Sequence, residues 1–397
     1  MNKRLAVITT HPIQYQAPLW RSLAKEIDIQ VYFGSDFSVR GSRDEGFGVH
    51  FSWDVPLTEG YPHTFLSLDP EINGPGDLKL NMAEFKRKLL EFRPGYALLN
   101  GYSPLPFYLK ALLVLRLLGI PILLRAETTD VARQRSALKE FSRHVFLKLL
   151  YSQIAGFLAI GYNSRHHYRS RGITENRIYH APYNIDDELV AKQIKDYRGR
   201  RTEIRRELGF AEDQFVFIFS GKLIPKKNPL MIVEALRLLS ADSGVSLGLI
   251  VLGDGLLRQQ FEAGMQALPG IKTVFTGFQN QSKLGRFYSA VDCLVLPSSW
   301  SETWGLVINE ALQFGMPVIV SDRVGCWRDL VIPAETGYVF PAGDAAALAD
   351  CMSRVISLSK LRGNGVREAC RQKARQYSVE QAVAGIRKCL VELPQSG

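Results

Sequence analysis

Two glutamates eight positions apart, Glu302 and Glu310, are the residues of this chain whose type and spacing best suit chemistry. Glu302 follows the apolar run 293–297, and Glu310 lies in the run 306–314, which Gly315 ends. These patterns predict a strand, a loop and a helix. An ionised carboxylate accepts hydrogen bonds through two oxygens, which suits sugar or ribose hydroxyls. The spacing therefore indicates a sugar-nucleotide site, and ordinary surface glutamates are the alternative.

The loop that carries Glu302 has a second feature that suits such a ligand. A loop that enters a helix presents backbone N–H groups and the positive end of the helix dipole, both of which favour a diphosphate. Gly305 allows the backbone to come close to the ligand.

Upstream, two lysines follow another apolar run at residues 215–219. Gly221 and Lys222 come directly after it, and Lys227 follows five residues later. Two cations at the end of a strand can pair with two phosphates and stabilise the charge on a departing nucleoside diphosphate, a task that otherwise falls to a metal ion. A solvated lysine-rich turn is the alternative.

Two further segments repeat this pattern of an apolar strand followed by a glycine turn. Residues 249–252 precede Gly253 and Gly255, and residues 273–276 precede Gly277 and Phe278. One glycine turn taken alone is weak evidence for a site.

Taken in order, these segments give the chain a family resemblance. The matching stretches are Gly221 to Lys227, Gly253 to Gly255, Gly277 with Phe278, residues 290–298, Glu302 with Glu310, and residues 315–318. They resemble the retaining glycosyltransferases of family four, which have the GT-B fold, and they cover most of residues 210–350. The resemblance implies an α/β protein with two doubly wound, Rossmann-like parallel sheets in two domains that face each other across a cleft.

The resemblance also implies roles for single residues. Lys222 and Lys227 would hold the diphosphate, Glu310 would hold the ribose, and Phe278 would border the base. Glu302 and the amides near Trp304 and Gly305 would meet the donor sugar. The implied donor site comprises Gly221, Lys222, Lys227, Gly253, Gly255, Phe278, Glu302, Thr303, Trp304, Gly305, Leu306 and Glu310.

The amino-terminal half departs from the family pattern in the loop after its first predicted strand, residues 5–10. Many members of the family have a glycine pair there, and this chain has none. Gln14 and Tyr15 offer side-chain hydrogen bonds to an acceptor instead, and His11 is a third candidate. Capping by the polar group and core packing by the rings are the alternatives.

A second departure concerns the mechanism. Glu127 stands where the family often has a histidine that faces the reaction centre. We expect Glu127 to act in catalysis with Lys222, Lys227 and Glu302, and we expect Arg125 to set the charge state of Glu127 or to contact an anionic acceptor. A purely structural pair of Arg125 and Glu127 is the alternative.

Length and composition agree with two domains. A chain of 397 residues exceeds what one core usually holds, and 46% hydrophobic residues supply apolar surface for two. Alternating strand and helix patterns favour parallel sheets with ligands at the carboxyl ends of the strands. We expect an acceptor-binding domain at 1–187, a charged linker at 192–206, a nucleotide-sugar-binding domain at 205–377, and a final segment, 378–397, that packs back on the first domain.

The net charge of +10 is partly concentrated in one basic, amphipathic pattern. Its basic residues are Arg133, Arg135, Lys139, Arg143 and Lys148, interleaved with Phe141, Val145, Phe146 and Leu149. Together with the apolar segment 105–120, this pattern suits peripheral contact with an anionic membrane that carries a lipid-linked acceptor. A core-packing helix with a solvated basic face is the alternative.

Several other classes of function fit the sequence poorly. The chain has no Asp-X-Asp triplet, so we expect no metal cofactor, and it has no recognisable nucleic-acid-binding module. No apolar run is long enough to span a bilayer, and the start reads as a strand rather than a signal peptide. Five cysteines, all in the second half, suit reduced thiols. We expect a cytoplasmic location, at the inner face of the cell membrane.

The sequence thus predicts a retaining transfer of a sugar from a UDP- or GDP-linked donor to a hydroxyl of a glycan or lipid-linked acceptor, in cell-surface polysaccharide or glycolipid synthesis. A nucleotide-sugar epimerase of the same fold and a non-catalytic protein that binds sugar nucleotides at a membrane are the alternatives.

Overall fold

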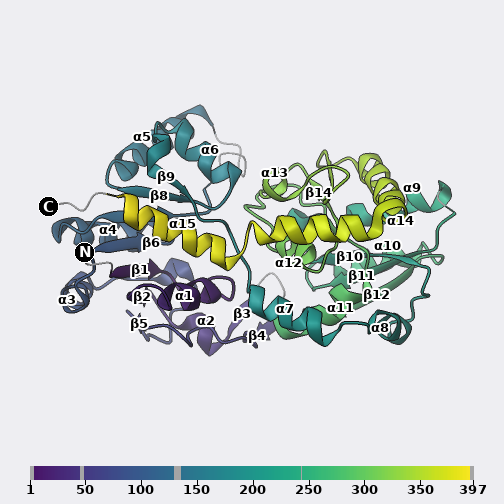
Figure 1. The fold of residues 1–397 in the computed structure, drawn as a ribbon, viewed down its shortest axis with the longest axis horizontal. Coiled ribbons are helices and arrows are strands. Elements are labelled where there is room, and N and C mark those ends of the chain that lie inside the picture. Colours follow the sequence, from purple (N-terminus) through teal and green to yellow (C-terminus); the bar gives the residue numbers. More distant parts are fainter. Residues whose placement is uncertain (1–3, 45–48, 129–135, 243, 394–397) are drawn as a thin grey trace.

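Two parallel β-sheets organise the protein (Figure 1). In this computed structural model, the residues described are 4–44, 49–128, 136–242 and 244–393. The first sheet is built from residues 5–180 and the second from residues 215–340. The predicted fold class, two doubly wound parallel sheets, is confirmed.

The first sheet has seven parallel strands in the order β5-β2-β1-β6-β7-β8-β9. Their bounds are β1 Leu5–Thr9, β2 Ile29–Phe33, β5 His63–Phe65, β6 Tyr96–Leu99, β7 Ile122–Arg125, β8 Gly156–Ala159 and β9 Ile178–His180. The strand order reverses between β1 and β6, and such a reversal opens a crevice at the carboxyl ends of the strands. A separate antiparallel ribbon pairs β3 (Ser42–Asp44) with β4 (Val49–Phe51).

Helices cover both faces of this sheet, which is why its strands are apolar along almost their whole length. One face packs against α1 (Ala17–Ala24), and the other packs against α3 (Met82–Phe92), α4 (Leu105–Leu117), α5 (Ala137–Tyr151) and α6 (Tyr162–Ser170). The short helix α2 spans Phe37–Arg40.

The second sheet has six parallel strands in the order β12-β11-β10-β13-β14-β15. The strands are β10 Phe215–Ser220, β11 Leu247–Leu252, β12 Lys272–Gly277, β13 Cys293–Leu296, β14 Val318–Ser321 and β15 Gly337–Phe340. The helices of this domain are α9 Leu230–Asp242, α10 Arg258–Gln266, α11 Leu284–Ala290, α12 Val307–Gln313, α13 Trp327–Leu330 and α14 Ala345–Arg375. The order reverses between β10 and β13, so the loops that carry Lys222 and Glu302 leave neighbouring strands.

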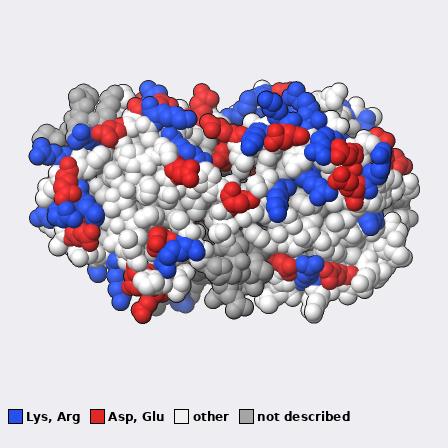
Figure 2. All heavy atoms as spheres, turned by 90° about the horizontal axis from the view of Figure 1, so that it is seen from below, with Lys and Arg blue, Asp and Glu red and all other residues white. Residues whose placement is uncertain are grey.

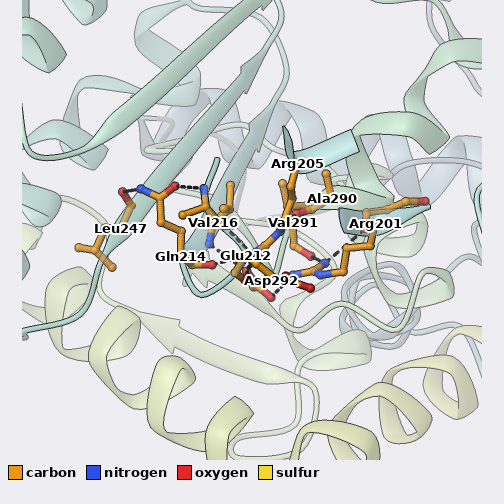
Figure 3. Close-up of polar contacts among 11 residues, drawn as sticks. Arg201, Arg205, Glu212, Gln214, Val216, Leu247, Ala290, Val291 and Asp292 are labelled. Atoms are coloured by element: carbon orange, nitrogen blue, oxygen red, sulfur yellow. Dashed lines mark hydrogen bonds and ion pairs between the residues drawn. The ribbon is translucent and has the colours of Figure 1, made fainter. Parts of the chain in front are cut away.

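The charged stretch that follows the first domain is helical and packs on the second domain. It forms α7 (Asp187–Asp196) and α8 (Arg201–Glu207). Buried Arg205 donates to Asp292 over 2.5 Å, Arg201 donates to the other oxygen of that carboxylate over 2.6 Å, and the amide of Val216 also donates to it, over 2.9 Å (Figure 3). The ion pairs connect α8 to the sheet through the residue before β13.

The chain returns to the first sheet at its end. Helix α15 (Val379–Glu392) packs against α1, β8 and β9, and its Ile386 and Cys389 lie in one core with Leu5 of β1 (Figure 1, yellow). Gly385 makes this approach possible, because a Cβ atom there would lie 1.8 Å from the carbonyl oxygen of His180.

Candidate functional site

A cavity of about 110 Å³ lies at the carboxyl ends of β10 and β11, where the second domain faces the first. Its lining comprises Tyr15, Trp53, Ser220, Gly221, Leu252, Gly253, Phe278, Gln279, Gln281, Leu284, Val307 and Glu310. Phe278 and Trp53 meet edge to face with ring centroids 6.5 Å apart. We call this space the donor-side cavity.

The structure explains why glycine is needed at two positions of this edge. A Cβ atom on Gly253, which has φ of +133°, would lie 1.9 Å from the carbonyl oxygen of Gly221. A Cβ atom on Gly255 would lie 2.7 Å from the carbonyl oxygen of Leu223. Two neighbouring loops therefore pack backbone to backbone, and this packing shapes the wall of the donor-side cavity.

Glu310 of α12 is buried at this cavity, and both of its oxygens accept hydrogen bonds. Tyr288 donates to one oxygen over 2.8 Å, and Tyr15 of the first domain donates to the other over 3.0 Å. Burial raises the pKa of Glu310 to about 7, although the two tyrosine hydrogen bonds lower it. Tyr15, which we had expected at the acceptor, thus contacts the residue expected to bind the ribose.

The raised pKa of Glu310 predicts a pH dependence of stability. Because the folded protein binds this proton more tightly than the unfolded chain does, the contribution of Glu310 to the free energy of unfolding falls as pH rises from about 4.5 to about 7. Glu310→Gln removes this component. Urea denaturation at pH 5 and pH 8 is expected to change the difference in unfolding free energy between variant and wild type by at least about 1 kcal/mol, in favour of the variant at pH 8. An equal difference at both pH values would contradict a raised pKa.

Lys227 and Glu302 form an ion pair beside the donor-side cavity. Lys227 ends the short turn Pro225–Lys227, and Ser298 also donates to Glu302, over 3.2 Å. The amide of Ser299 donates to the carbonyl of Lys226 over 2.9 Å, so the lysine loop and the Glu302 loop are held together. Burial lowers the pKa of Lys226. Lys222 directly follows Gly221 at the start of the same loop.

Glu127 joins the two domains next to this ion pair. Thr303 donates to one of its oxygens over 2.5 Å, and Tyr183 donates to the other. Thr303 is the neighbour of Glu302 in sequence, so the predicted catalytic glutamates lie in adjoining loops of opposite domains. The structure thus brings Glu127 to the donor loop that the sequence could not connect to it.

A second cavity, of about 300 Å³, lies on the first-domain side of Glu127, and we call it the acceptor-side cavity. Its lining comprises Thr9, Thr10, Ile13, Gln16, Asn100, Gly101, Tyr102, Ser103, Tyr108, Arg125, Ala126, Glu127, Ile160 and Tyr183. Arg125 donates to the carbonyl oxygens of Ala181 and Pro182, and it forms no ion pair with Glu127. Arg125 and Glu127 are therefore not in direct contact, although the charge of Glu127 acts to raise the pKa of Arg125.

Other predicted residues lie outside both cavities. His11 bonds to Thr10 over 2.9 Å, and its ring lies tilted against that of Phe37 with the centroids 4.4 Å apart. Burial lowers the pKa of His11 to about 4. Gln14 does not line either cavity. Trp304 is buried and donates to Asn309 over 2.8 Å, so its ring packs the domain interface rather than facing a ligand. Gly305 and Leu306, which precede α12, line neither cavity.

Several lining residues carry no signal in the sequence. Trp53 and Gln281, which line the donor-side cavity, belong to no glycine turn or charged motif. Tyr183, which lines the acceptor-side cavity, lies in the loop after β9 within the predicted first domain. Tyr288, which donates to Glu310, reads as an ordinary apolar position of a helix. These side chains acquire their positions from contacts between segments that are far apart in the chain.

Among the described residues, the structure contains neither a metal-binding cluster nor a membrane-spanning helix. Across residues 4–393 and outside the gaps stated above, no cluster of three histidine, cysteine or acidic side chains has the arrangement of a metal site. Within that same part of the chain, no helix combines the length and apolar character needed to cross a membrane.

Part of the chain is similar to a known sequence family. Residues 200–377 match the family described as glycosyl transferases group 1. A GDP-mannose-dependent alpha-mannosyltransferase of Mycobacterium tuberculosis is 33% identical over 144 residues, which are 36% of this chain and 35% of that protein. A lipopolysaccharide 1,2-N-acetylglucosaminetransferase of Salmonella typhimurium is 27% identical over 36% of this chain and 39% of its own length. The chain thus spans well under half of these two relatives.

Solved structures resemble the chain over its whole length. The Anabaena protein HepE in complex with UDP and glucose matches with a TM-score of 0.70 and 16% identity, over 98% of this chain and 100% of that one. A glycosyltransferase of Rickettsia africae matches with a TM-score of 0.73 and 13% identity over all of both chains. The protein therefore has the GT-B fold of these glycosyltransferases, and its second domain matches the glycosyl transferases of group 1.

Proposed function

We propose that this protein is a retaining glycosyltransferase that moves a sugar from a nucleoside diphosphate sugar to an acceptor hydroxyl. One observation supports this proposal most strongly. The donor-side cavity, the Lys227–Glu302 pair, the Thr303–Glu127 contact and the acceptor-side cavity follow one another across the domain interface. Residues 205–377 would bind the donor, residues 1–187 the acceptor, and residues 378–397 would close the first domain.

The donor is a UDP- or GDP-linked sugar. The Mycobacterium relative is named for GDP-mannose, and the Anabaena structure contains UDP. In this chain, Glu310 would accept from the ribose hydroxyls in place of Tyr15, and Phe278 with Trp53 would border the base. The Lys222 and Lys227 ammonium groups would hold the diphosphate without a metal ion.

The transfer occurs on one face of the sugar. The bond between the anomeric carbon and the diphosphate oxygen breaks, a bond from that carbon to the acceptor oxygen forms, and the acceptor proton passes to the departing diphosphate. Lys222 and Lys227 stabilise the charge that develops on that diphosphate. Glu302 orients the donor sugar, and Glu127 orients the acceptor hydroxyl beside it.

The product distinguishes this proposal from its alternatives. The purified protein would be incubated with UDP-glucose or GDP-mannose and an extract of membrane glycolipids, and the products would be examined by NMR. Glycosidic product with the anomeric configuration of the donor supports the proposal, and an inverted product contradicts it. A changed sugar on free nucleotide would indicate an epimerase, and tight donor binding with no turnover over a range of acceptors would indicate a binding protein.

We also propose that the acceptor is part of a cell-surface polysaccharide or glycolipid, reached at the cytoplasmic face of an anionic membrane. The Salmonella relative is named for a lipopolysaccharide transfer. Large apolar side chains are exposed at every fourth position on α4 and α5, which cover the same face of the first sheet. These two exposed rows, which we call together the apolar ridge, consist of Leu105, Leu109, Leu113 and Leu117 on α4 and of Phe141, Val145 and Leu149 on α5.

The charges around the apolar ridge favour an anionic surface. Helix α4 has no acidic residue, and the one glutamate of α5, Glu140, is paired with Arg143 and Arg171. Exposed Lys110 and Lys148 flank the ridge. By contrast, both signs of charge are interspersed on the face shown in Figure 2. Phe146 is half-buried, and Arg133 and Arg135, which we expected in this helix, lie outside the described residues.

Cosedimentation with vesicles tests the apolar ridge. Leu113→Asp with Leu149→Asp is expected to weaken binding to phosphatidylglycerol-containing vesicles by at least about tenfold, because burying one leucine contributes about 1.5 kcal/mol. Leu361→Asp is the matched control, since this leucine of α14 is 83% exposed but belongs to the second domain. Equal binding of wild type and both variants, or no preference for anionic over neutral vesicles, would contradict membrane contact through this ridge.

A further inference from the structure

The acceptor-side cavity contains a buried positive charge that has no carboxylate in contact with it. The charged residues of its lining are Arg125 and Glu127, and the others are apolar groups, hydroxyls and amides. Arg125 is 3% exposed and ends β7, with its guanidinium 5.4 Å from the centroid of the Tyr183 ring. Burial lowers the pKa of Arg125, although the charge of Glu127 partly offsets this effect.

The hydrogen bonds of Arg125 leave part of its guanidinium available to a ligand. A guanidinium has five N–H donors. The Nε atom donates to the carbonyl of Ala181 over 3.4 Å, and Nη2 donates to the carbonyl of Pro182 over 2.9 Å. Among the residues that the structure describes, both N–H groups of Nη1 and the second of Nη2 have no hydrogen-bond partner. These three are at the end of the guanidinium that can grip a planar anion with two hydrogen bonds.

Glu127 does not neutralise this group through contact. Its two oxygens accept from the hydroxyls of Tyr183 and Thr303. A buried charge whose donors are incompletely matched is costly unless an opposite charge completes it. The acceptor-side cavity therefore has the electrostatics of an anion site at one wall and the hydroxyls of Thr10 and Ser103 at others.

We propose that the acceptor sugar carries an anionic group, a carboxylate or a phosphate, and that this group pairs with Arg125. This inference rests on the proposed function, because it names the acceptor class of the same site. The volume of about 300 Å³ equals that of about ten water molecules at roughly 30 Å³ each, which suits one monosaccharide. Arg125 would thus select an acidic terminal sugar and fix its hydroxyl next to Glu127.

Binding of matched sugars to the wild-type protein tests the proposal without any substitution. The protein, saturated with whichever of UDP and GDP it binds, would be titrated by saturation-transfer NMR with methyl uronides of gluco, galacto and manno configuration, with the three matching neutral methyl glycosides, and with the matching sugar 6-phosphates. We expect at least one acidic sugar to bind about tenfold or more tightly than its neutral partner. The affinities for the uronides and for the sugar 6-phosphates show whether a carboxylate or a phosphate is preferred.

Two variants connect that preference to Arg125. Arg125→Met is expected to reduce the affinity for the acidic sugar to that for its neutral partner. Arg125→Lys is expected to retain part of the preference, because lysine keeps the positive charge but lacks the paired N–H donors of the guanidinium. Nucleotide affinity and the melting temperature of each variant report whether the fold has survived. If the methionine variant unfolds, the role of Arg125 is judged from the affinities of the lysine variant and the wild type for acidic and neutral sugars.

The outcomes separate this inference from the proposed function. If the nucleotide binds but no acidic sugar is preferred, or if the preference survives in a folded Arg125→Met protein, the acidic acceptor is wrong and the transferase proposal stands. If no nucleotide binds, the proposed function itself fails.

Discussion

Glu302→Ala is expected to lower kcat for sugar transfer by at least about 100-fold while the affinity for the nucleoside diphosphate changes by less than about threefold. Glu302 is paired with Lys227 and accepts from Ser298, so its carboxylate is fixed in place next to Thr303, the residue that donates to Glu127. A group that contacts the donor sugar, and not the diphosphate, acts mainly in the transition state.

Steady-state kinetics and nucleotide titration of the same preparations measure this effect. Glu335→Ala is the matched control, since Glu335 is an exposed glutamate of the same domain and lies outside both cavities. Equal losses of turnover and nucleotide affinity would show that Glu302 serves the diphosphate through Lys227 and does not contact the sugar.

Arg205→Met is expected to lower the free energy of unfolding by about 3 kcal/mol, because it leaves the carboxylate of Asp292 with only Arg201 and the Val216 amide as partners (Figure 3). Arg205 also donates to the carbonyls of Ala290 and Gln214, which lose that donor. Urea denaturation would measure the effect.

The control for this stability effect is Arg200→Met, one residue before α8. Arg200 pairs with Glu203 at the start of the same helix, where both side chains are exposed to solvent. Its replacement is expected to leave the urea midpoint unchanged within error. Similar losses for both arginines would mean that Asp292 does not depend on Arg205.

The positions of the candidate donor residues could be predicted because local patterns determine them. The apolar run before Glu302 forms β13, and the run that contains Glu310 forms α12, so a loop glutamate and a helix glutamate both face the end of one sheet. Lys222 and Lys227 follow β10 in the same way. Strand periods, glycine turns and helix ends are properties of short segments, and a single sequence contains them.

Contacts between domains could not be predicted in this way. Tyr15 reaches Glu310 across 295 positions of sequence, and Thr303 reaches Glu127 across 176. A single sequence does not give the position of one sheet relative to the other, so the contact of Tyr15 with Glu310 could not be predicted from it. Arg125 likewise has Glu127 two positions away, but the carbonyls of a later loop bind it instead.

The contacts of the charged segment 192–206 could not be predicted for another reason. Arg201 and Arg205 look like solvated linker residues, because a count of charges does not reveal which side of a helix is covered. Asp292, which lies just before β13, accepts from both, and the buried guanidinium of Arg205 also donates to the backbone carbonyls of Ala290, Glu212 and Gln214. The ring of Trp304 is buried against Tyr183 of the first domain, and the predicted contact of its backbone amide with the donor sugar stays a prediction.

A thermal-shift titration with UDP, GDP and ADP tests the donor site most directly, because a ligand that binds only the folded protein raises its melting temperature. We expect a clear, concentration-dependent rise in melting temperature with UDP or GDP for the wild type and for Glu335→Ala, and a much smaller rise for Glu310→Ala. A wild-type protein whose melting temperature does not respond to any of the three nucleotides, or a Glu310→Ala protein that responds as the wild type does, would contradict the assignment of the donor site to Lys222, Lys227 and Glu310.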